Sequence, residues 1–230
     1  MTNQKSLTNN VLSSSTLLFI ARFFQKSVGI ISLIILSRIL DVEDYAVIAI
    51  CTFVLYLADT LSTLGSESFI VRKTEVTNDD LNTAFSLDLV AKLSIWLIII
   101  VSIPVITIFL DEYEDIGIAL FVSSLVLFIN AFKNPGVYLL NRDFSYKGIF
   151  ILQLAQKLIA FVVTISIAVV YESYWALIIG DLIFAFIYLI GSYKVSSYRP
   201  KLGFVGFTIQ WDFSKWIIIS SAIGYLRAQL

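Results

Sequence analysis

Residues 83–109 read TAFSLDLVAKLSIWLIIIVSIPVITIF, an apolar run whose only charged residues are Asp88 and Lys92. A helix of about 20 apolar residues is long enough to cross the hydrocarbon core of a bilayer. In the whole chain 58% of the residues are hydrophobic and only 14% are charged, and a soluble fold of 230 residues would not bury so much apolar surface. The run therefore predicts a membrane-spanning helix in a membrane protein.

Comparable apolar runs continue on both sides of this stretch, separated by short polar connections. The pattern predicts an all-α, polytopic helical membrane protein with one six-helix lobe and the start of a seventh helix. The other complete runs are 12–38, 44–64, 115–138, 148–170 and 174–193, and the seventh begins near Phe213. We expect a cytoplasmic amino terminus at 1–11, a six-helix transmembrane lobe at 12–193, a cytoplasmic connection at 194–212 and an incomplete seventh transmembrane helix at 213–230.

The basic residues of the connections lie almost entirely on one side of the predicted membrane. Lys and Arg in short loops remain on the cytoplasmic side. The first, third and fifth connections contain Arg38 as their only basic residue, beside several acids. We therefore predict a multi-pass protein with a cytoplasmic amino terminus. The basic residues on that side are Lys5, Arg72, Lys73, Lys133, Arg142, Lys147, Lys194, Arg199, Lys201 and Lys215.

The composition argues against an enzyme. The chain has no histidine and one cysteine, Cys51 in the second predicted span, which removes the usual general base, metal ligands and nucleophilic pairs. The sequence also lacks the glycine patterns of dinucleotide- and phosphate-binding loops. We predict no catalytic residue, cofactor, metal site or nucleic-acid partner. A membrane enzyme built from carboxylates alone is the alternative, although the sequence has no DDxxD motif.

Several charged residues lie inside the predicted spans. An ionisable group there costs about 2.5 to 3.5 kcal/mol and persists mainly where it is paired or faces water. These residues are therefore candidates for a functional site. They are the basic Arg22, Lys26, Lys92, Lys157 and Arg227 and the acidic Asp59, Asp88 and Asp181.

Polar residues recur at helical spacing along four of the spans, so that each span has one polar face. A polar stripe on a membrane helix lines a cavity or contacts a neighbouring helix. We predict that the four stripes face one interior and that their charged groups form one cluster. The stripes are Ser15, Arg22, Gln25, Lys26, Gly29 and Ser32; Thr52, Tyr56, Asp59 and Thr63; Asp88 and Lys92; and Gln153, Gln156, Lys157 and Thr164.

Two pairs within these stripes allow a structural as well as a functional interpretation. Asp88 and Lys92 are four residues apart, so they form either an ion pair on one helix or part of a site. Lys157 is either paired with Asp181 on the next helix or free to bind a ligand. Sequence does not decide between these interpretations.

Arg22 and Lys26 in the first span have no acid within one helical turn. They are therefore the best candidates for ligand binding. Within the complete spans the basic groups slightly outnumber the acidic groups, which favours an anionic ligand such as a phosphate.

Asn130, Asn134 and Pro135 interrupt the fourth predicted span. A proline inside a membrane helix frees a backbone carbonyl and permits a bend. The bend is either a hinge in a transport motion or a packing irregularity.

Five motifs in the connections occur in the same order in one known family. Together they resemble the Wzx-type polysaccharide and lipid-linked oligosaccharide flippases, in the MOP superfamily that also contains the MATE multidrug antiporters. The likeness extends from about residue 12 to the end of the chain, and it departs from the family pattern of Gly, Pro and Gly at Asp41, Val42 and Ala46. The motifs are SRILDVEDYA at 37–46, DLNTAF at 80–85, NRDFSY at 141–146, YWAL at 174–177 and YRPKL at 198–202.

The resemblance implies an exporter in the bacterial inner (cell) membrane. Such a protein moves undecaprenyl-pyrophosphate-linked oligosaccharide repeat units outward for lipopolysaccharide, capsule or other surface polysaccharide biosynthesis. The chain resembles the amino-terminal lobe alone, so we expect a truncated or fragmentary form that does not transport by itself. The alternatives are a multidrug or cation antiporter of the same superfamily and a non-transporting membrane module.

The resemblance also implies partners and site residues. The expected partners are a lipid-linked oligosaccharide substrate, membrane lipids, the missing carboxy-terminal lobe and polysaccharide synthesis proteins. We assign substrate binding to Arg22, Lys26, Lys92, Lys157, Gln25 and Tyr56, and ion coupling to Asp59, Asp88 and Asp181.

Overall fold

The computed structural model describes the chain at residues 2–110, 113 and 115–229, and its side chains at residues 16, 17, 19–110, 113, 115–217 and 220. All regular structure within these residues is helical, as the apolar runs predict. The predicted side chains of Ser15 and Arg227 lie outside the described residues. The helices are α1 (Thr2–Leu36), α2 (Val42–Ser62), α3 (Ser66–Arg72), α4 (Asn78–Phe109), α5 (Ile116–Ala131), α6 (Gly136–Arg142), α7 (Tyr146–Tyr171), α8 (Trp175–Val195) and α9 (Phe207–Gln229).

Five of the described helices are long and apolar enough to cross a membrane, and the bent pair α5 and α6 makes a sixth span if it is counted as one. This confirms a polytopic helical membrane protein. The outer helices differ in extent from the predicted runs, because α1 begins at Thr2 and α9 begins at Phe207. The short helices α3 and α6 were not predicted, since each has only 7 residues and escapes a search for span-length runs.

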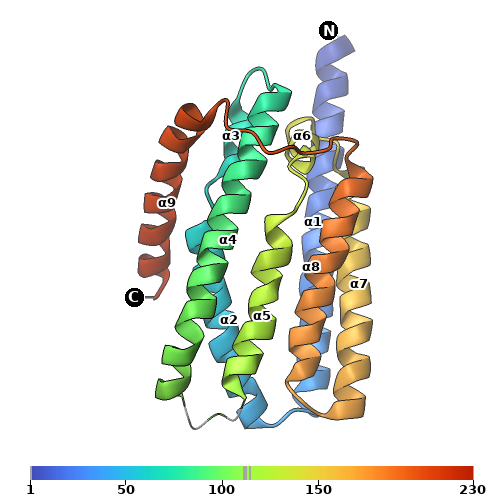
Figure 1. Cartoon of the computed structure of the whole chain (residues 1–230). Coiled ribbons are helices and arrows are strands. Elements are labelled where there is room, and N and C mark those ends of the chain that lie inside the picture. Colours follow the sequence, from blue (N-terminus) through green and yellow to red (C-terminus); the bar gives the residue numbers. More distant parts are fainter. Residues whose placement is uncertain (1, 111–112, 114, 230) are drawn as a thin grey trace.

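The spans stand side by side with their connections at the two ends of the bundle (Figure 1). One end, which we call the basic end, holds the start of α1, the short helices α3 and α6, and the α8–α9 connection. The opposite end, which we call the acidic end, holds the α1–α2, α4–α5 and α7–α8 connections. The basic and acidic connections of the sequence thus lie at opposite ends of the bundle.

The helices pack in a continuous series. α1 packs on α7, α7 on α8, α8 on α5, and α5 on both α2 and α4, while α9 lies against α2, α3 and α4. α7 and α8 approach closely because Gly180 of α8 faces the Thr164 side chain of α7, where any larger residue would clash. α1 and α4 consequently lie on opposite sides of the α5–α8 pair.

Two spans change direction at the basic end. Between α2 and α3, Gly65 has a φ of 72°, a left-handed conformation that glycine adopts without strain. Its missing side chain also matters, because a Cβ there would lie 2.8 Å from Ile217 of α9. α5 and α6 meet at an angle of 67°, which confirms the predicted bend in the fourth span.

Asn134 holds the bend between α5 and α6 in place. Its side chain is buried, and its Nδ2 donates a hydrogen bond to the Tyr198 carbonyl at 2.7 Å. Its Oδ1 accepts one from Gly136 N at 2.9 Å, and its own backbone N donates to Ser192 Oγ at 3.1 Å. Because these bonds tie the bend to α8 and the connection after it, the structure favours a packed corner over a free hinge.

The α8–α9 connection is anchored along the start of α4. Asn82 Oδ1 accepts hydrogen bonds from the Tyr198 hydroxyl at 2.6 Å and from Lys201 N at 2.8 Å, and Ser86 Oγ accepts one from Gly203 N at 2.8 Å. Burial raises the pKa of the Tyr198 hydroxyl above its ordinary value, so the group stays protonated and keeps donating. These bonds fix the position of α9 beside α4 (Figure 1).

Candidate ligand-binding cavity

Among the described residues, three adjoining hollows bring charged side chains together, and the one at α1 and α7 is open, with Arg22 and Lys26 exposed. The basic-end hollow, of about 300 Å³, lies beneath α3 and α6, and the central hollow, of about 390 Å³, lies between α2, α5 and α8. The α1–α7 hollow, of about 360 Å³, is lined by α1 and α7 together with Phe184 of α8. The first two share Asp59, Asn130, Lys133 and Tyr188, and the last two share Phe184, so the three hollows adjoin in a row.

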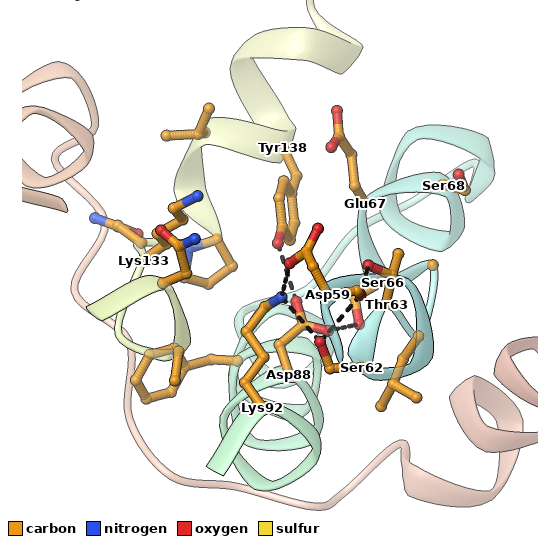
Figure 2. A pocket seen from close by; sticks show the side chains of 18 of the residues that line it. Asp59, Ser62, Thr63, Ser66, Glu67, Ser68, Asp88, Lys92, Lys133 and Tyr138 are labelled. Atoms are coloured by element: carbon orange, nitrogen blue, oxygen red, sulfur yellow. Dashed lines mark hydrogen bonds and ion pairs between the residues drawn. The ribbon is translucent and has the colours of Figure 1, made fainter. Parts of the chain in front are cut away.

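Asp88 lies at the centre of the basic-end hollow (Figure 2). Ser66 Oγ donates a hydrogen bond to its Oδ1 at 2.6 Å, and the Tyr138 hydroxyl donates to its Oδ2 at 3.0 Å. Both carboxylate oxygens therefore have a protein donor, which lowers the cost of placing this group inside a bundle. Asp88 thereby joins α4 to the two short helices, α3 through Ser66 and α6 through Tyr138.

Lys92 pairs with Asp59 of α2 and not with Asp88 on its own helix. Its Nζ lies 3.0 Å from Asp59 Oδ1 and 3.5 Å from Ser62 Oγ. Among the described residues no ion pair within 4.0 Å joins Lys92 to Asp88. The interpretation of Asp88 and Lys92 as a self-contained ion pair is therefore wrong, because both Asp88 oxygens already accept from α3 and α6, and α2 brings a second carboxylate to Lys92.

Lys133 is a cavity residue that the sequence placed in a connection. It follows α5 at the bend and lines both the basic-end and the central hollow. Its Nζ lies 4.6 Å from the ring centroid of Tyr188, a cation–π contact. Within the described ranges it has no ion pair. The Asn134–Pro135 break beside it was the signal that this lysine turns inward.

The central hollow contains most of the predicted polar stripe of α2, whereas Thr63 lines the basic-end hollow. Thr52, Tyr56 and Asp59 line it from α2, opposite Gln156 of α7 and Asp181 of α8. The alternative pairing of Asp181 with Lys157 does not form, since no ion pair within 4.0 Å joins them in the described part of the chain. The two residues line different hollows.

The α1–α7 hollow gathers the cations predicted to bind a ligand. Arg22, Gln25 and Lys26 lie on one face of α1 and meet Lys157 of α7. Gln25 Nε2 donates to the backbone carbonyl oxygen of Gln153 at 3.5 Å, a long hydrogen bond that ties α1 to α7. Among the residues with described side chains, none of the three cations has an ion pair within 4.0 Å, and no acid lines this hollow.

The charged groups predicted to form one cluster are thus divided between hollows. Asp59, Asp88 and Lys92 lie together at the basic end, whereas Arg22 and its two neighbouring cations lie in the α1–α7 hollow. The division follows from the packing, because α4 and α1 lie on opposite sides of the α5–α8 pair. The α1–α7 hollow offers cationic groups and one amide, a set suited to an anion. The described residues contain no group of acids and thiols that would hold a metal ion.

Hydrogen bonds at the two ends of the bundle involve residues of the sequence motifs. At the acidic end, Asp44 Oδ1 accepts a hydrogen bond from Tyr174 N at 2.9 Å, which links the motifs at 37–46 and 174–177. At the basic end, Asn82 and Tyr198 link the motifs at 80–85 and 198–202, and Asn141 Nδ2 donates to Glu67 at 2.6 Å. The motif residues therefore hold helices and connections together, whereas residues of the polar stripes line the hollows.

This structure defines a multi-pass helical membrane protein with charged hollows between its helices. A family model described as "Polysaccharide biosynthesis protein" matches residues 35–230, and the chain belongs to that family. The match confirms the family predicted from the five motifs.

One curated relative extends this result. The chain is 22% identical over 232 residues to the lipopolysaccharide biosynthesis protein WzxC of Escherichia coli K12. The similar region covers 98% of this chain and 46% of WzxC, so the chain spans less than half the length of that relative. No solved structure matches the chain.

Proposed function

We propose that the chain is one lobe of a flippase that exports undecaprenyl-pyrophosphate-linked oligosaccharide repeat units for surface polysaccharide biosynthesis. Membership of a polysaccharide biosynthesis family and the likeness to WzxC support the process. The structure supports a site for an anionic headgroup. The lobe acts by binding and moving its substrate and makes or breaks no covalent bond.

The observation that carries this proposal is the group of cations in the α1–α7 hollow. Arg22, Lys26 and Lys157 line one hollow, and no acid lines it among the described residues. Like charges brought together repel one another, and an anion relieves that repulsion. A pyrophosphate offers several acceptor oxygens to the guanidinium fork and the ammonium groups. Tyr56 in the adjoining central hollow and Lys92 in the basic-end hollow beyond it are further substrate contacts.

The proposed mechanism divides the substrate between two environments. Pyrophosphate and sugars do not cross hydrocarbon unaided, because the loss of hydration is too costly. They enter the polar hollows while the lipid tail stays in the bilayer. The lobe lies in the bacterial inner membrane with its basic end in the cytoplasm, and it rocks against a second lobe to expose the cavity on alternate sides. Asp59, Asp88 and Asp181 are the proposed ion-coupling carboxylates.

A binding experiment tests the headgroup site. The purified chain in lipid nanodiscs is mixed with undecaprenyl pyrophosphate or with undecaprenol, and bound lipid is measured by native mass spectrometry. We expect the pyrophosphate lipid to bind at least about tenfold more tightly, and the double substitution Arg22→Ala and Lys26→Ala to remove that preference. Lys194→Ala is the control, because Lys194 is an exposed lysine of α8 that lines none of the three hollows.

Equal binding of the two lipids would overturn the headgroup site, as would an unchanged preference in the double variant. A cell experiment tests transport itself. The same two substitutions, at the aligned positions of a full-length relative, should abolish surface polysaccharide in a strain that lacks its own exporter, at unchanged protein level. Normal surface polysaccharide would show that these cations are not needed for export.

A further inference from the structure

The central hollow differs in chemistry from the α1–α7 hollow beside it. Its polar lining is rich in hydrogen-bond acceptors, with the carboxylates of Asp59 and Asp181 and the amides of Asn130 and Gln156. Among the described residues, Lys133 is the only cation in its lining. Asp181 has no ion pair within the described residues, whereas Asp59 is paired with Lys92. The hollow thus calls for a ligand that donates hydrogen bonds and carries little negative charge.

Two of these acceptors have no partner in the described part of the protein. The amide oxygens Asn130 Oδ1 and Gln156 Oε1 are buried and accept no hydrogen bond. Gln156 is only 4% exposed, so it lines the hollow with a small part of its surface and is otherwise covered by protein. A buried acceptor without a donor is costly. The last torsion of an amide side chain is soft, so a small rotation changes the direction in which its oxygen points.

We propose that the central hollow binds a neutral, hydroxyl-rich sugar ring through the amide oxygens of Asn130 and Gln156 and the carboxylate of Asp181. This inference rests on the proposed function and names the part of the substrate held next to the phosphate. Sugar hydroxyls are donors, and each one that meets an orphaned amide oxygen satisfies a group that the protein leaves without a partner.

The remaining walls of the hollow suit a sugar ring as well. The apolar side chains Leu55, Val126 and Leu127 also line it, and apolar groups suit the C–H faces of a ring. The volume of about 390 Å³ lies within the usual range of small-molecule sites, about 300 to 1,000 Å³. An acidic sugar fits poorly, because its carboxylate would approach the carboxylates of Asp59 and Asp181.

The relative positions of the central and α1–α7 hollows indicate how the bound substrate is oriented. Phe184 lines both, so the sugar site in the central hollow begins where the cationic α1–α7 hollow ends. The pyrophosphate would lie on the α1 side and the first sugar on the α2 and α5 side. This arrangement keeps the phosphate away from Asp181 and the hydroxyl groups near the amide oxygens.

Saturation-transfer NMR on the chain in nanodiscs tests the sugar site. The probes are the neutral methyl glycosides of glucose, galactose and mannose, with glucuronate as the acidic comparison. We expect saturation transfer to at least one neutral glycoside and less to glucuronate. Gln156→Met keeps the side-chain length but removes the acceptor, so it should weaken binding of that glycoside by about threefold or more. Gln156→Glu retains an acceptor and should keep more of the signal than Gln156→Met.

Gln153→Met is the matched control, because Gln153 lies one turn from Gln156 on α7 and lines none of the three hollows. Absence of transfer to every neutral glycoside would overturn the sugar site, as would equal transfer in the wild-type chain and Gln156→Met. Binding of inorganic pyrophosphate to the same samples reports separately on the α1–α7 hollow. If pyrophosphate binds and depends on Arg22 while the glycosides do not bind, the sugar site fails and the proposed function stands.

Discussion

The basic-end hollow and the α1–α7 hollow both contain charged side chains from long apolar helices, yet the protein treats those charges in opposite ways; in the α1–α7 hollow Arg22 and Lys26 are exposed. At the basic end, Asp88 accepts hydrogen bonds from two other helices and Lys92 is paired with Asp59. In the α1–α7 hollow, Arg22 and Lys157 have no ion pair within the described residues. The first arrangement stabilises the lobe, and the second leaves charge available for a ligand.

The comparison shows why a charged residue in a membrane span is not by itself a functional site. When a charged group has a partner inside the protein, that interaction offsets much of the free-energy cost of desolvation and holds helices together. Unpaired groups gain most from water or a ligand. Substitutions at the basic end should therefore lower the stability of the lobe, whereas substitutions in the α1–α7 hollow should weaken ligand binding.

The largest effect is expected from Asp88→Ala. Loss of the carboxylate leaves the Ser66 and Tyr138 hydroxyls without their acceptor and disconnects α4 from α3 and α6. Two unsatisfied donors in a partly buried site cost about 1 to 3 kcal/mol together. We expect a clearly lower thermal unfolding midpoint in detergent, followed by circular dichroism.

Asp79→Ala provides the control for this prediction, because Asp79 is an exposed acid in the first turn of the same helix. It should change the midpoint far less than Asp88→Ala does. Equal midpoints for the wild-type chain and Asp88→Ala would show that the carboxylate does not stabilise the basic end. The paired charges there would then have no structural role that distinguishes them from the unpaired cations of the α1–α7 hollow.

A smaller effect, on binding alone, is expected from Lys157→Met in the α1–α7 hollow. The substitution keeps most of the side-chain volume and removes one of the three cations around the proposed anion. Affinity for inorganic pyrophosphate, measured by isothermal titration calorimetry, should fall by about tenfold, which corresponds to about 1.4 kcal/mol. The unfolding midpoint should not fall, because no ion pair is lost.

Lys157→Arg separates charge from shape at this position. It should retain most of the pyrophosphate affinity, since the positive charge remains. A fall in affinity as large as that of Lys157→Met would mean that the site depends on packing around Lys157 and not on its charge.

Much of the fold was predictable because its signals are local. Span-length apolar runs predicted the long helices, and Asn134 with Pro135 predicted the bend between α5 and α6. The short helices α3 and α6 were missed because 7 residues are too few for a span, and the apolar Val137 allowed the run at 115–138 to continue across the bend.

The candidate cavity was predictable only in part. Helical spacing placed Arg22, Gln25 and Lys26 on one face of α1, and the structure brings them to one hollow with Lys157. The partner of Lys92 was not predictable, because spacing along one helix favoured Asp88 and only the packing of α2 brings in Asp59. The rule that lysines in short loops lie in the cytoplasm assigned Lys133 to a connection. In the structure the bend between α5 and α6 places it in the lining of a hollow instead.

The smallest effect is expected for the ion pair between Lys92 and Asp59, at the boundary between the basic-end and central hollows. The Lys92 side chain is only 14% exposed, but Asp59 is 56% exposed, so solvent screens much of the attraction. A double-mutant cycle with Lys92→Met and Asp59→Asn should give a coupling energy of about 0.5 to 1 kcal/mol in unfolding experiments. Lys92→Met should also weaken pyrophosphate binding less than Lys157→Met does, because Lys92 already has an acid beside it. A loss of affinity equal to that of Lys157→Met would place Lys92 in the same anion site, and pairing would then no longer separate structural from ligand-binding cations in this lobe.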